Sequence, residues 1–227
     1  MQPKVLVGCP TSDHKAYCLE PYIEGLKKLT YNNKDILIVD NSATDDYMKR
    51  IQTLGIPAVH IPWHPSARER IIQSRNILRE KTINEGYEYF LSLEQDVIPP
   101  PNIIETLLSH HKEIIAGIYY NKFPTPQGEI ELLPLAYKVK EDYLRPLTPQ
   151  ELEGKQPISV AGIGLGCVLI HRNILKKIKF TYTPDTAAFD DMHFSKEVLQ
   201  QGHKIFVDPT QKCMHLIKNW TWEGIER

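Results

Sequence analysis

The sequence predicts an α/β protein in which helices flank a mostly parallel central sheet, with a small antiparallel element added. In the first half of the chain, short apolar segments alternate with amphipathic ones in the order strand, helix, strand, helix, strand, helix, strand. This alternation is typical of parallel sheets, because each parallel connection crosses over through a helix. Acidic residues follow several of these strands, at the carboxyl edge where such sheets bind ligands.

The first two strands are short and apolar. The first is Lys4–Gly8, and the loop Cys9–Asp13 follows at its carboxyl end. Apolar residues then recur at helical spacing as far as Leu29, with Asp13 as the candidate N-cap. The second strand, Asp35–Asp40, again ends in an acid.

A second helix, a third strand and a long helix follow. Thr44 is the candidate cap of the second helix, which Gly55 ends. Residues Ile56–Ile61 form the third strand. The long helix is predicted over Ala67–Glu85, with its apolar side chains on one side and Gly86 as its stop.

The stretch Tyr87–Pro100 reads as a buried strand that ends in Glu94 and Asp96. Because side chains alternate along a strand, these two carboxylates leave on the same face, and Gln95 leaves on the other. Burying acidic side chains at the end of a core strand costs free energy unless a cation, a hydrogen-bonding ligand or open water interacts with them. The pair alone fits a solvated strand end equally well. With Asp40 at the same edge, a cation-dependent site is favoured.

The second half of the chain is less regular. The segment Asn121–Pro157 is rich in proline, and only LLPLAYKV within it reads as a strand. It is interpreted as an inserted loop with a hairpin element that builds a variable substrate wall. The remaining elements are a helix from Pro101, strand Glu113–Tyr119, two apolar runs around the glycines of Pro157–His171, helices Asn173–Lys179 and Asp190–Gln201, and strands His203–Val207 and Gln211–Ile217.

Composition excludes several classes of partner. The net charge of −1 at pH 7 gives no reason to expect nucleic acid or acidic membranes. No apolar run approaches the roughly 18 residues of a spanning helix, and the N-terminus reads as a first strand rather than a signal peptide. The cysteines share no metal-type spacing, which favours reduced, buried thiols in a cytoplasmic protein. Peripheral membrane association through a partner stays open.

Four blocks in order give the chain a resemblance to the GT-A glycosyltransferases, in particular the family 2-like group. They cover most of the chain apart from Asn121–Pro157. The blocks are DILIVDNSATDD (Asp35–Asp46), ARERIIQSRN (Ala67–Asn76) with YFLSLEQD (Tyr89–Asp96), VAGIGLGCVLIHR (Val160–Arg172), and FDDMHFSKEVLQQGHKIFVDPTQKCMHL (Phe189–Leu216).

The resemblance implies a metal-dependent transfer of a sugar from a nucleotide diphosphate, most readily a UDP-sugar, to a hydroxyl of a carbohydrate or glycoconjugate acceptor. Oxygen ligands and a histidine imply Mn²⁺ or Mg²⁺ as the cofactor. We expect one domain, 1–227, with a nucleotide-binding half (1–120) and an acceptor and catalytic half (121–227) that includes the insertion 121–157. The donor-binding residues that it implies are Pro10, Thr11, Asp40, Arg75, Glu94 and Gln95.

The resemblance also assigns the metal and the base. Asp96 and His215 match metal ligands, while Glu94 stands in place of the usual first aspartate, toward the ribose or a metal-bound water. Asp191 falls on the position of the catalytic base in inverting members, which favours inversion. Because Asp190 replaces the commoner glutamate beside it, the base is assigned only within this pair.

Two other functions remain open from the sequence. A sugar-1-phosphate nucleotidyltransferase would need a glycine-rich, basic loop after the first strand, and Cys9–Asp13 holds neither glycine nor a basic residue. A non-catalytic nucleotide- or sugar-binding protein would have no need for Asp96, Asp191 and His215 together. Binding of nucleoside diphosphates without donor hydrolysis or transfer would favour the second alternative.

Overall fold

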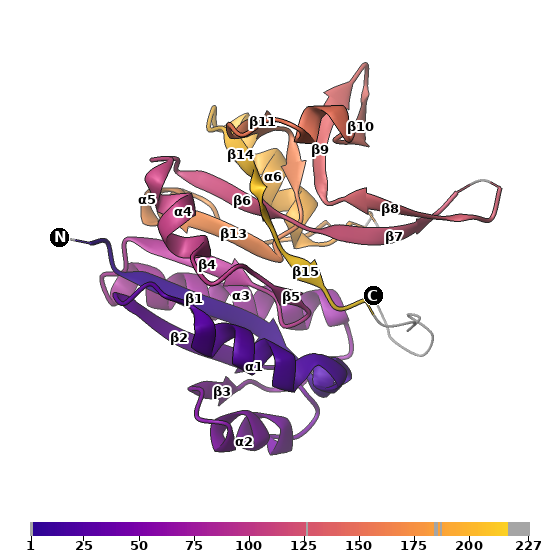
Figure 1. Ribbon diagram of the computed structural model, residues 1–227. Helices are drawn as coiled ribbons and strands as arrows, with labels where there is room; N and C mark the ends of the chain where they lie inside the picture. The colour runs from indigo at the N-terminus through magenta and orange to yellow at the C-terminus, as the bar shows by residue number, and fades with distance from the viewer. Residues whose placement is uncertain (1, 126, 184–185, 187, 218–227) are drawn as a thin grey trace.

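The computed structural model describes residues 2–125, 127–183, 186 and 188–217, and within them a large sheet forms the centre of the molecule (Figure 1). β1 runs parallel to β2 and β4, β2 to β3, and β6 to β14, while β13 is antiparallel to both of its neighbours and β11 to β14. The predicted mostly parallel sheet is therefore confirmed. Its strand order is β11 (Ile158–Val160), β14 (Ile205–Lys212), β6 (Ile114–Ile118), β13 (Cys167–His171), β4 (Tyr89–Leu93), β1 (Val5–Thr11), β2 (Lys34–Asp40) and β3 (Ala58–His60).

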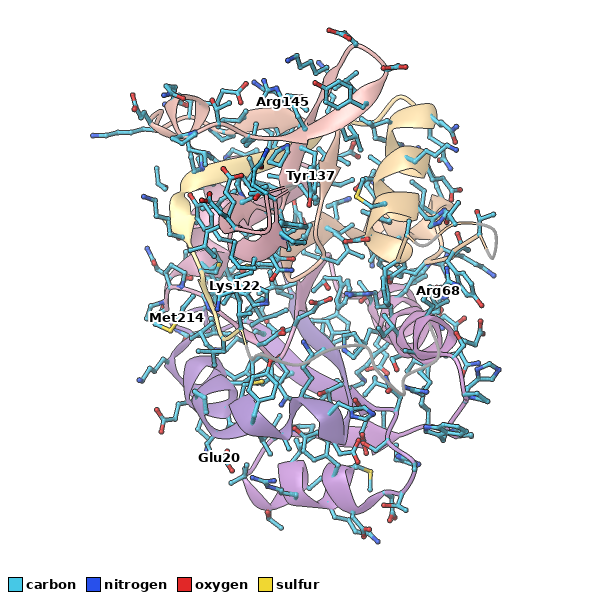
Figure 2. The ribbon with its side chains drawn as sticks, turned by 90° about the vertical axis from the view of Figure 1, so that its right-hand side faces the viewer. Glu20, Arg68, Lys122, Tyr137, Arg145 and Met214 are labelled. Atoms are coloured by element: carbon cyan, nitrogen blue, oxygen red, sulfur yellow. The ribbon has the colours of Figure 1, made fainter. Side chains whose placement is uncertain are left out.

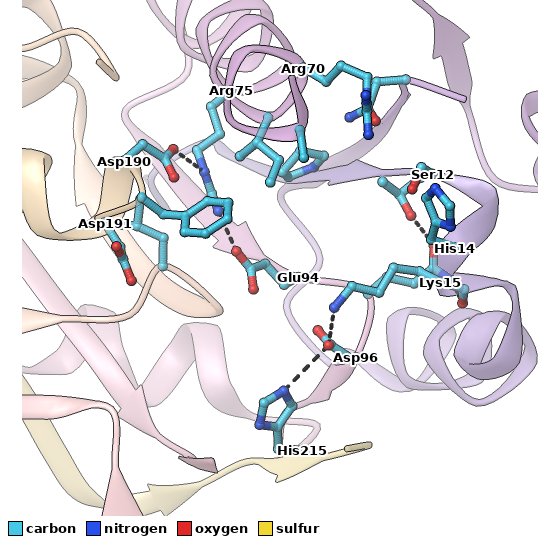
Figure 3. A pocket seen from close by; sticks show the side chains of 18 of the residues that line it. Ser12, His14, Lys15, Arg70, Arg75, Glu94, Asp96, Asp190, Asp191 and His215 are labelled. Carbon is cyan, nitrogen blue, oxygen red and sulfur yellow. Dashed lines mark hydrogen bonds and ion pairs between the residues drawn. The ribbon is translucent and has the colours of Figure 1, made fainter. Parts of the chain in front are cut away.

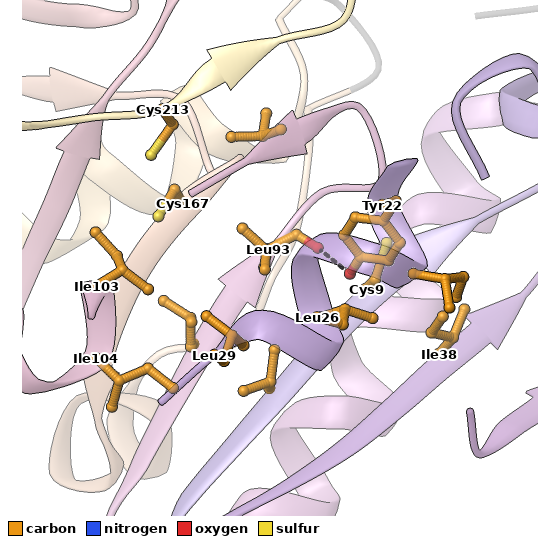
Figure 4. Packing of buried hydrophobic residues seen from close by; sticks show 14 of the residues in the cluster. Cys9, Tyr22, Leu26, Leu29, Ile38, Leu93, Ile103, Ile104, Cys167 and Cys213 are labelled. Atoms are coloured by element: carbon orange, nitrogen blue, oxygen red, sulfur yellow. Dashed lines mark hydrogen bonds between the residues drawn. The ribbon is translucent and has the colours of Figure 1, made fainter. Parts of the chain in front are cut away.

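Helices cover both faces of this sheet. Alternate residues of β1 face opposite ways, so that Val5 and Val7 pack with α1, α2 and α4, and Leu6 packs with α3, α5 and α6. Figure 4 shows part of the first core, where the Tyr22 hydroxyl donates to the Leu93 carbonyl at 2.8 Å. The helices are α1 (Leu19–Lys28), α2 (Asp46–Thr53), α3 (Ala67–Asn84), α4 (Ile103–Ser109), α5 (Arg172–Lys177) and α6 (Asp190–Gln200).

Two predicted helix caps are wrong. Asp13 is not the cap of α1, because the 3₁₀ turn η1 (Asp13–Cys18) comes first and its own N-cap is Ser12. Likewise α2 is capped by Asp45 instead of Thr44, whose hydroxyl donates to the side chain of Asp46 at 2.8 Å. Short polar side chains near a helix start can satisfy one another as well as the backbone, so sequence places caps only approximately.

The segment Asn121–Pro157 is more regular than predicted. It contributes the hairpin β7 (Tyr120–Pro124) with β8 (Ile130–Pro134), which projects from the body, and the hairpin β9 (Ala136–Lys140) with β10 (Tyr143–Pro146) (Figure 1). The single strand predicted for LLPLAYKV is wrong, because Leu135 separates β8 from β9. Prolines suggested a loop, yet Pro124, Pro134 and Pro146 are each the last residue of a strand, where the ladder tolerates a missing N–H. The short 3₁₀ turn η2 (Gln150–Leu152) follows.

The glycines after Pro157 make room for one aromatic side chain. A Cβ on Gly166 would lie 2.6 Å from the hydroxyl of Tyr119, and the Gly166 N–H donates to that hydroxyl at 2.9 Å. Gly164 and Gly166 thus let the backbone pass close to Tyr119, where a Cβ would clash. β12 (Gly162–Ile163) precedes these two glycines and pairs with β9.

The end of the described chain returns to the sheet edge. β14 runs on through Pro209, where a strand and a separate turn were predicted, with a shift of register after Asp208. β15 (Met214–His215) then pairs antiparallel with β5 (Val97–Ile98), which places His215 opposite Val97. This short pairing brings the last predicted site residue beside the acidic turn.

Figure 2 shows the ribbon with its side chains drawn as sticks. The four cysteines are free and buried, as the expectation of reduced thiols requires. Among the described residues, no helix combines the length and apolar character that crossing a membrane demands.

Candidate active site

A cavity of about 350 Å³ opens at the carboxyl edge of β1 and β4 (Figure 3). Its size is that of small-molecule sites in proteins. Residues from the β1 loop, from α3, from the turn after β4, from the start of α6 and from β15 meet around it. The predicted site residues that line it are Pro10, Thr11, Arg75, Glu94, Gln95, Asp96, Asp190, Asp191 and His215.

Asp40 is the predicted site residue that does not line the cavity. Its side chain is fully buried, and its carboxylate accepts hydrogen bonds from the Ser42 N–H at 3.0 Å and the Met48 N–H at 3.1 Å. His60 Nδ1 lies 3.2 Å from the same carboxylate. Asp40 therefore fixes the loop after β2, while its neighbour Asn41 lines the cavity.

The acidic stretch is a tight turn after β4, so the strand is shorter than predicted. β4 ends at Leu93, and the Val97 N–H donates to the Glu94 carbonyl at 2.9 Å to close the turn. Gln95 is buried and accepts a hydrogen bond from the Thr11 hydroxyl at 2.5 Å. Its amide donates to the Tyr47 hydroxyl at 2.7 Å and so connects the turn to α2. Gln95 thus holds the turn in place from behind the two carboxylates.

Asp96 lies between two basic side chains. One of its oxygens, Oδ2, pairs with Lys15 Nζ and lies 3.4 Å from His215 Nε2 (Figure 3). Burial alone would raise the pKa of this carboxyl, but the hydrogen bond from His215 and the charge of Lys15 hold it well below its usual range. The other oxygen, Oδ1, is buried and has no hydrogen-bond partner among the described residues.

The backbone fixes the orientation of His215. Nδ1 lies 2.7 Å from the Tyr120 carbonyl oxygen, which can only accept, so Nδ1 carries a hydrogen. Burial would lower the pKa of His215, but the hydrogen bond from Nε2 to Asp96 raises it, so Nε2 carries a hydrogen as well. Loss of that hydrogen would leave the Nε2 lone pair for a cation. A carbonyl behind a histidine in this way is the usual support of a metal-ligating imidazole.

Arg75 joins the two acidic parts of the cavity. This residue is 2% exposed, and its guanidinium pairs with Glu94 and, through Nε, with Asp190 Oδ2 at 2.7 Å. It also donates to the Ser92 hydroxyl at 2.7 Å. The sequence placed Arg75 near the nucleotide; the structure shows a buried bridge between the turn after β4 and the start of α6 (Figure 3).

Asp191 is the second residue of α6 and lines the cavity. Burial raises its pKa to about 7, with a further contribution from the negative charge of Asp190. The Met192 N–H, which donates to Oδ1 at 2.7 Å, acts in the opposite direction. At this helix start, burial outweighs the helix dipole, and the carboxyl titrates close to neutral pH, where a general base is most effective.

Sequence reasoning missed several polar side chains that line the cavity, among them Lys15, Asn41, Arg70 and Tyr119. Lys15 lies in η1, the first element after β1, and Asn41 lies in the loop after β2. Ligands of such sheets gather at those loops, so this position was the available signal. Nothing in the local sequence distinguishes Arg70 or Tyr119 from ordinary helix and strand residues.

The cavity fits a divalent cation that is only partly held by protein. The described residues contain no group of three or more His, Cys, Asp and Glu side chains that could hold a metal ion. Asp96 and His215 nevertheless offer an unpartnered carboxylate oxygen and an oriented imidazole nitrogen. Mg²⁺ and similar ions are often held by one or two side chains together with substrate phosphates, and this donor set suits that arrangement.

A mostly parallel sheet that carries a charged cavity at its carboxyl edge has the arrangement expected for the GT-A fold. The chain belongs to glycosyl transferase family 2, whose sequence model matches residues 14–179. The predicted resemblance and fold class are thereby confirmed, and the chain is a glycosyltransferase. Comparison with curated proteins finds no match.

Solved structures with the same fold include two distant ones. The structure of GalNAc-T7 with UDP, GalNAc and Mn²⁺ superposes with a TM-score of 0.68 at 15% identity, over 99% of this chain and 45% of that one. The chain thus spans less than half the length of GalNAc-T7. A197 from STIV superposes with a TM-score of 0.53 at 19% identity, over 95% of this chain and 86% of that one. At these identities the likeness shows the fold alone.

Proposed function

We propose that this glycosyltransferase moves a sugar from a UDP-sugar to a hydroxyl of a carbohydrate or glycoconjugate, with inversion and with a divalent cation, Mn²⁺ or Mg²⁺. One observation carries the proposal: Asp96, Asp191 and His215, from three segments far apart in sequence, line one cavity. An ordinary solvated strand end would not gather these side chains. The UDP and Mn²⁺ of the GalNAc-T7 structure support the choice of donor and metal.

The donor would bind between the β1 loop and α3. Thr11, Asn41 and Arg70 offer a hydroxyl, an amide and a guanidinium to the base, ribose and phosphates. When bound, the cation would be held by Asp96 and His215 and would neutralise the negative charge that gathers on the leaving diphosphate. The halves 1–120 and 121–227 then serve donor and acceptor respectively, with the hairpins of 121–157 as the acceptor wall.

Asp191 would act as the general base. The acceptor hydroxyl gives its proton to the Asp191 carboxylate while its oxygen forms a bond to the anomeric carbon. The bond from that carbon to the diphosphate oxygen breaks, and the diphosphate leaves with the electron pair. Attack opposite the leaving group inverts the configuration. Arg75 pairs with Asp190 beside the base and fixes the start of α6.

A non-catalytic nucleotide-binding protein is the second candidate function. Thermal shift with UDP, GDP and CDP, with and without Mn²⁺, tests donor choice, and slow hydrolysis of the matching nucleotide sugar tests catalysis. We expect the largest stabilisation from UDP with Mn²⁺, followed by measurable hydrolysis. Binding without hydrolysis or transfer would favour the second candidate.

Cytoplasmic location is proposed from the four reduced cysteines, and cell fractionation tests it.

Replacing Asp96 by alanine is expected to weaken UDP binding in the presence of Mn²⁺ by about 100-fold and to abolish the effect of Mn²⁺ on that binding. The variant loses the unpartnered oxygen on which cation binding depends. Calorimetric titration with and without Mn²⁺ measures both quantities. Asp46→Ala, an exposed carboxylate at the start of α2, is the matched control. Unchanged affinity of Asp96→Ala under both conditions would refute the assignment.

A further inference from the structure

Lys15 is a charged cavity residue to which the proposed reaction gives no role. It belongs to η1, directly after the β1 loop, and its ammonium pairs with Asp96 Oδ2 (Figure 3). Its side chain is 27% exposed, whereas that of Asp96 is 6% exposed. A cation of the protein itself thus holds the carboxylate that a divalent cation would need.

The backbone of Lys15 is fixed more firmly than its side chain. The Lys15 carbonyl accepts from the Gln95 amide at 2.6 Å and from the Cys18 thiol at 3.1 Å. Its N–H donates to the Ser12 carbonyl at 2.9 Å. Since Gln95 is itself buried in the turn beside Asp96, the root of the lysine is anchored to that turn, and only the long side chain is left to change partner.

We propose that Lys15 and the divalent cation compete for Asp96, and that Lys15 moves from Asp96 to the diphosphate of the donor when the cation binds. This inference rests on the proposed function, because it takes Asp96 and His215 as the ligands of the cation.

Competition follows because the two cations would share one carboxylate. A divalent cation held jointly by Asp96 and His215 would bind the carboxylate whose Oδ1 has no partner among the described residues and whose Oδ2 lies 3.4 Å from His215 Nε2. Lys15 Nζ already pairs with Oδ2, and two positive charges on one buried carboxylate repel each other. The cation therefore gains its full interaction with Asp96 only after the ammonium has left.

The cavity offers the displaced ammonium one strong new partner. Lys15 lines the same cavity as Thr11 and Asn41, at the end proposed for the donor. A lysine ammonium is a compact charge that binds phosphate oxygens well. Donor and cation then bind cooperatively: the diphosphate draws the lysine off Asp96, and the cation takes its place. The cavity without donor keeps Asp96 neutralised and binds the cation weakly.

Mn²⁺ binding measured by the electron paramagnetic resonance signal of the free ion tests the proposal without any turnover. In Lys15→Met without nucleotide, Mn²⁺ is expected to bind about tenfold more tightly than in the wild type, since the competitor is gone. UDP without metal is expected to bind about tenfold more weakly to the variant, and the gain in Mn²⁺ affinity caused by UDP is expected to shrink.

Control variants separate charge from side-chain shape. Lys15→Arg keeps the charge, so its Mn²⁺ affinity is expected to stay near that of the wild type, which also keeps the proposal testable should Lys15→Met fail to fold. Lys49→Met removes a surface lysine paired with Asp45 on α2 and is expected to change neither affinity.

The outcomes distinguish the two proposals. Equal Mn²⁺ affinity in the wild type and Lys15→Met, or weaker binding in the variant, would overturn the competition and leave a metal-dependent transferase standing. Equal affinity in Lys15→Met and Lys15→Arg would do the same. Absence of Mn²⁺ binding in every protein, with UDP present, would overturn the metal site and the competition together.

Discussion

Replacing Asp191 by asparagine is expected to lower kcat by about 10³-fold, within the usual range for loss of a general base. The amide keeps the shape of the side chain but cannot accept the proton of the acceptor hydroxyl. UDP affinity is expected to remain unchanged, because Asp96, His215 and the β1 loop are untouched. Steady-state transfer kinetics and calorimetric titration with UDP measure the two effects separately.

The wild-type pH profile provides a second test of the same residue. Burial raises the pKa of Asp191 to about 7, and a general base works only when deprotonated. The rate is therefore expected to rise with pH up to about 7 and then level off, falling about tenfold per pH unit below that value. A profile that is flat between about pH 5 and pH 8 would contradict the assignment.

Stability separates the loss of the base from unfolding. A carboxyl whose folded-state pKa lies above its ordinary value stabilises the fold at low pH, and that contribution is lost as pH rises through about 7. The amide in Asp191→Asn cannot ionise, so the variant should melt no earlier than the wild type at about pH 8. Glu197→Gln, the same change on the same helix outside the cavity, should keep full activity. Retained turnover in the Asp191 variant would move the base to Asp190.

Regular apolar periodicity made the first half of the fold predictable. β2 and α3 lie where their apolar patterns placed them, and β1 and β4 lie there with different ends, because each buries its side chains in the sheet or against it. The parallel topology alone predicted that Glu94 and Asp96 lie at the same edge of the sheet as the β1 loop. Helix caps were less predictable: neither Ser12 nor Asp45 makes a side-chain cap hydrogen bond, so the local sequence does not mark them.

Long-range contacts in the site were not accessible to periodicity. His215 reaches Asp96 through the two-residue pairing of β15 with β5, which is too short to leave a pattern in the sequence. Its place came from the family resemblance. The only signal for Lys15 was its position after the first strand. Arg75 was expected near the nucleotide from the resemblance, and sequence could not show that its guanidinium pairs with Glu94 and Asp190. The hairpins of 121–157 were hidden by prolines that mark strand ends.

Replacing Arg75 by methionine is expected to lower the free energy of unfolding by about 3–5 kcal/mol near neutral pH. The arginine side chain is 2% exposed and separates Glu94 from Asp190, whose side chain is 3% exposed. Without the guanidinium, Asp190 is left unpaired in the interior, with a second carboxylate nearby. Urea unfolding followed by circular dichroism measures the loss.

The pH dependence of this loss identifies its cause. Burial raises the pKa of Asp190 and Arg75 opposes that rise, so removing the guanidinium raises this pKa further. A raised folded-state pKa contributes stability at low pH that disappears as pH rises. The difference between wild type and Arg75→Met should therefore be smaller near about pH 5 than near about pH 8. Lys81→Met, which breaks a surface pair with Glu85 on the same helix, should cost about 0–1 kcal/mol.

If Arg75→Met lowers the free energy of unfolding equally at both pH values, the arginine stabilises the fold by packing rather than by its charge. Packing does not depend on pH, whereas the ionisation of Asp190 does. A variant as stable as the wild type would show that water reaches Asp190 once the guanidinium is gone. In the expected case, the same ion pairs that stabilise the core also hold Asp190 and the start of α6 against the turn after β4. The stability of this region and the position of the proposed base then depend on one buried guanidinium.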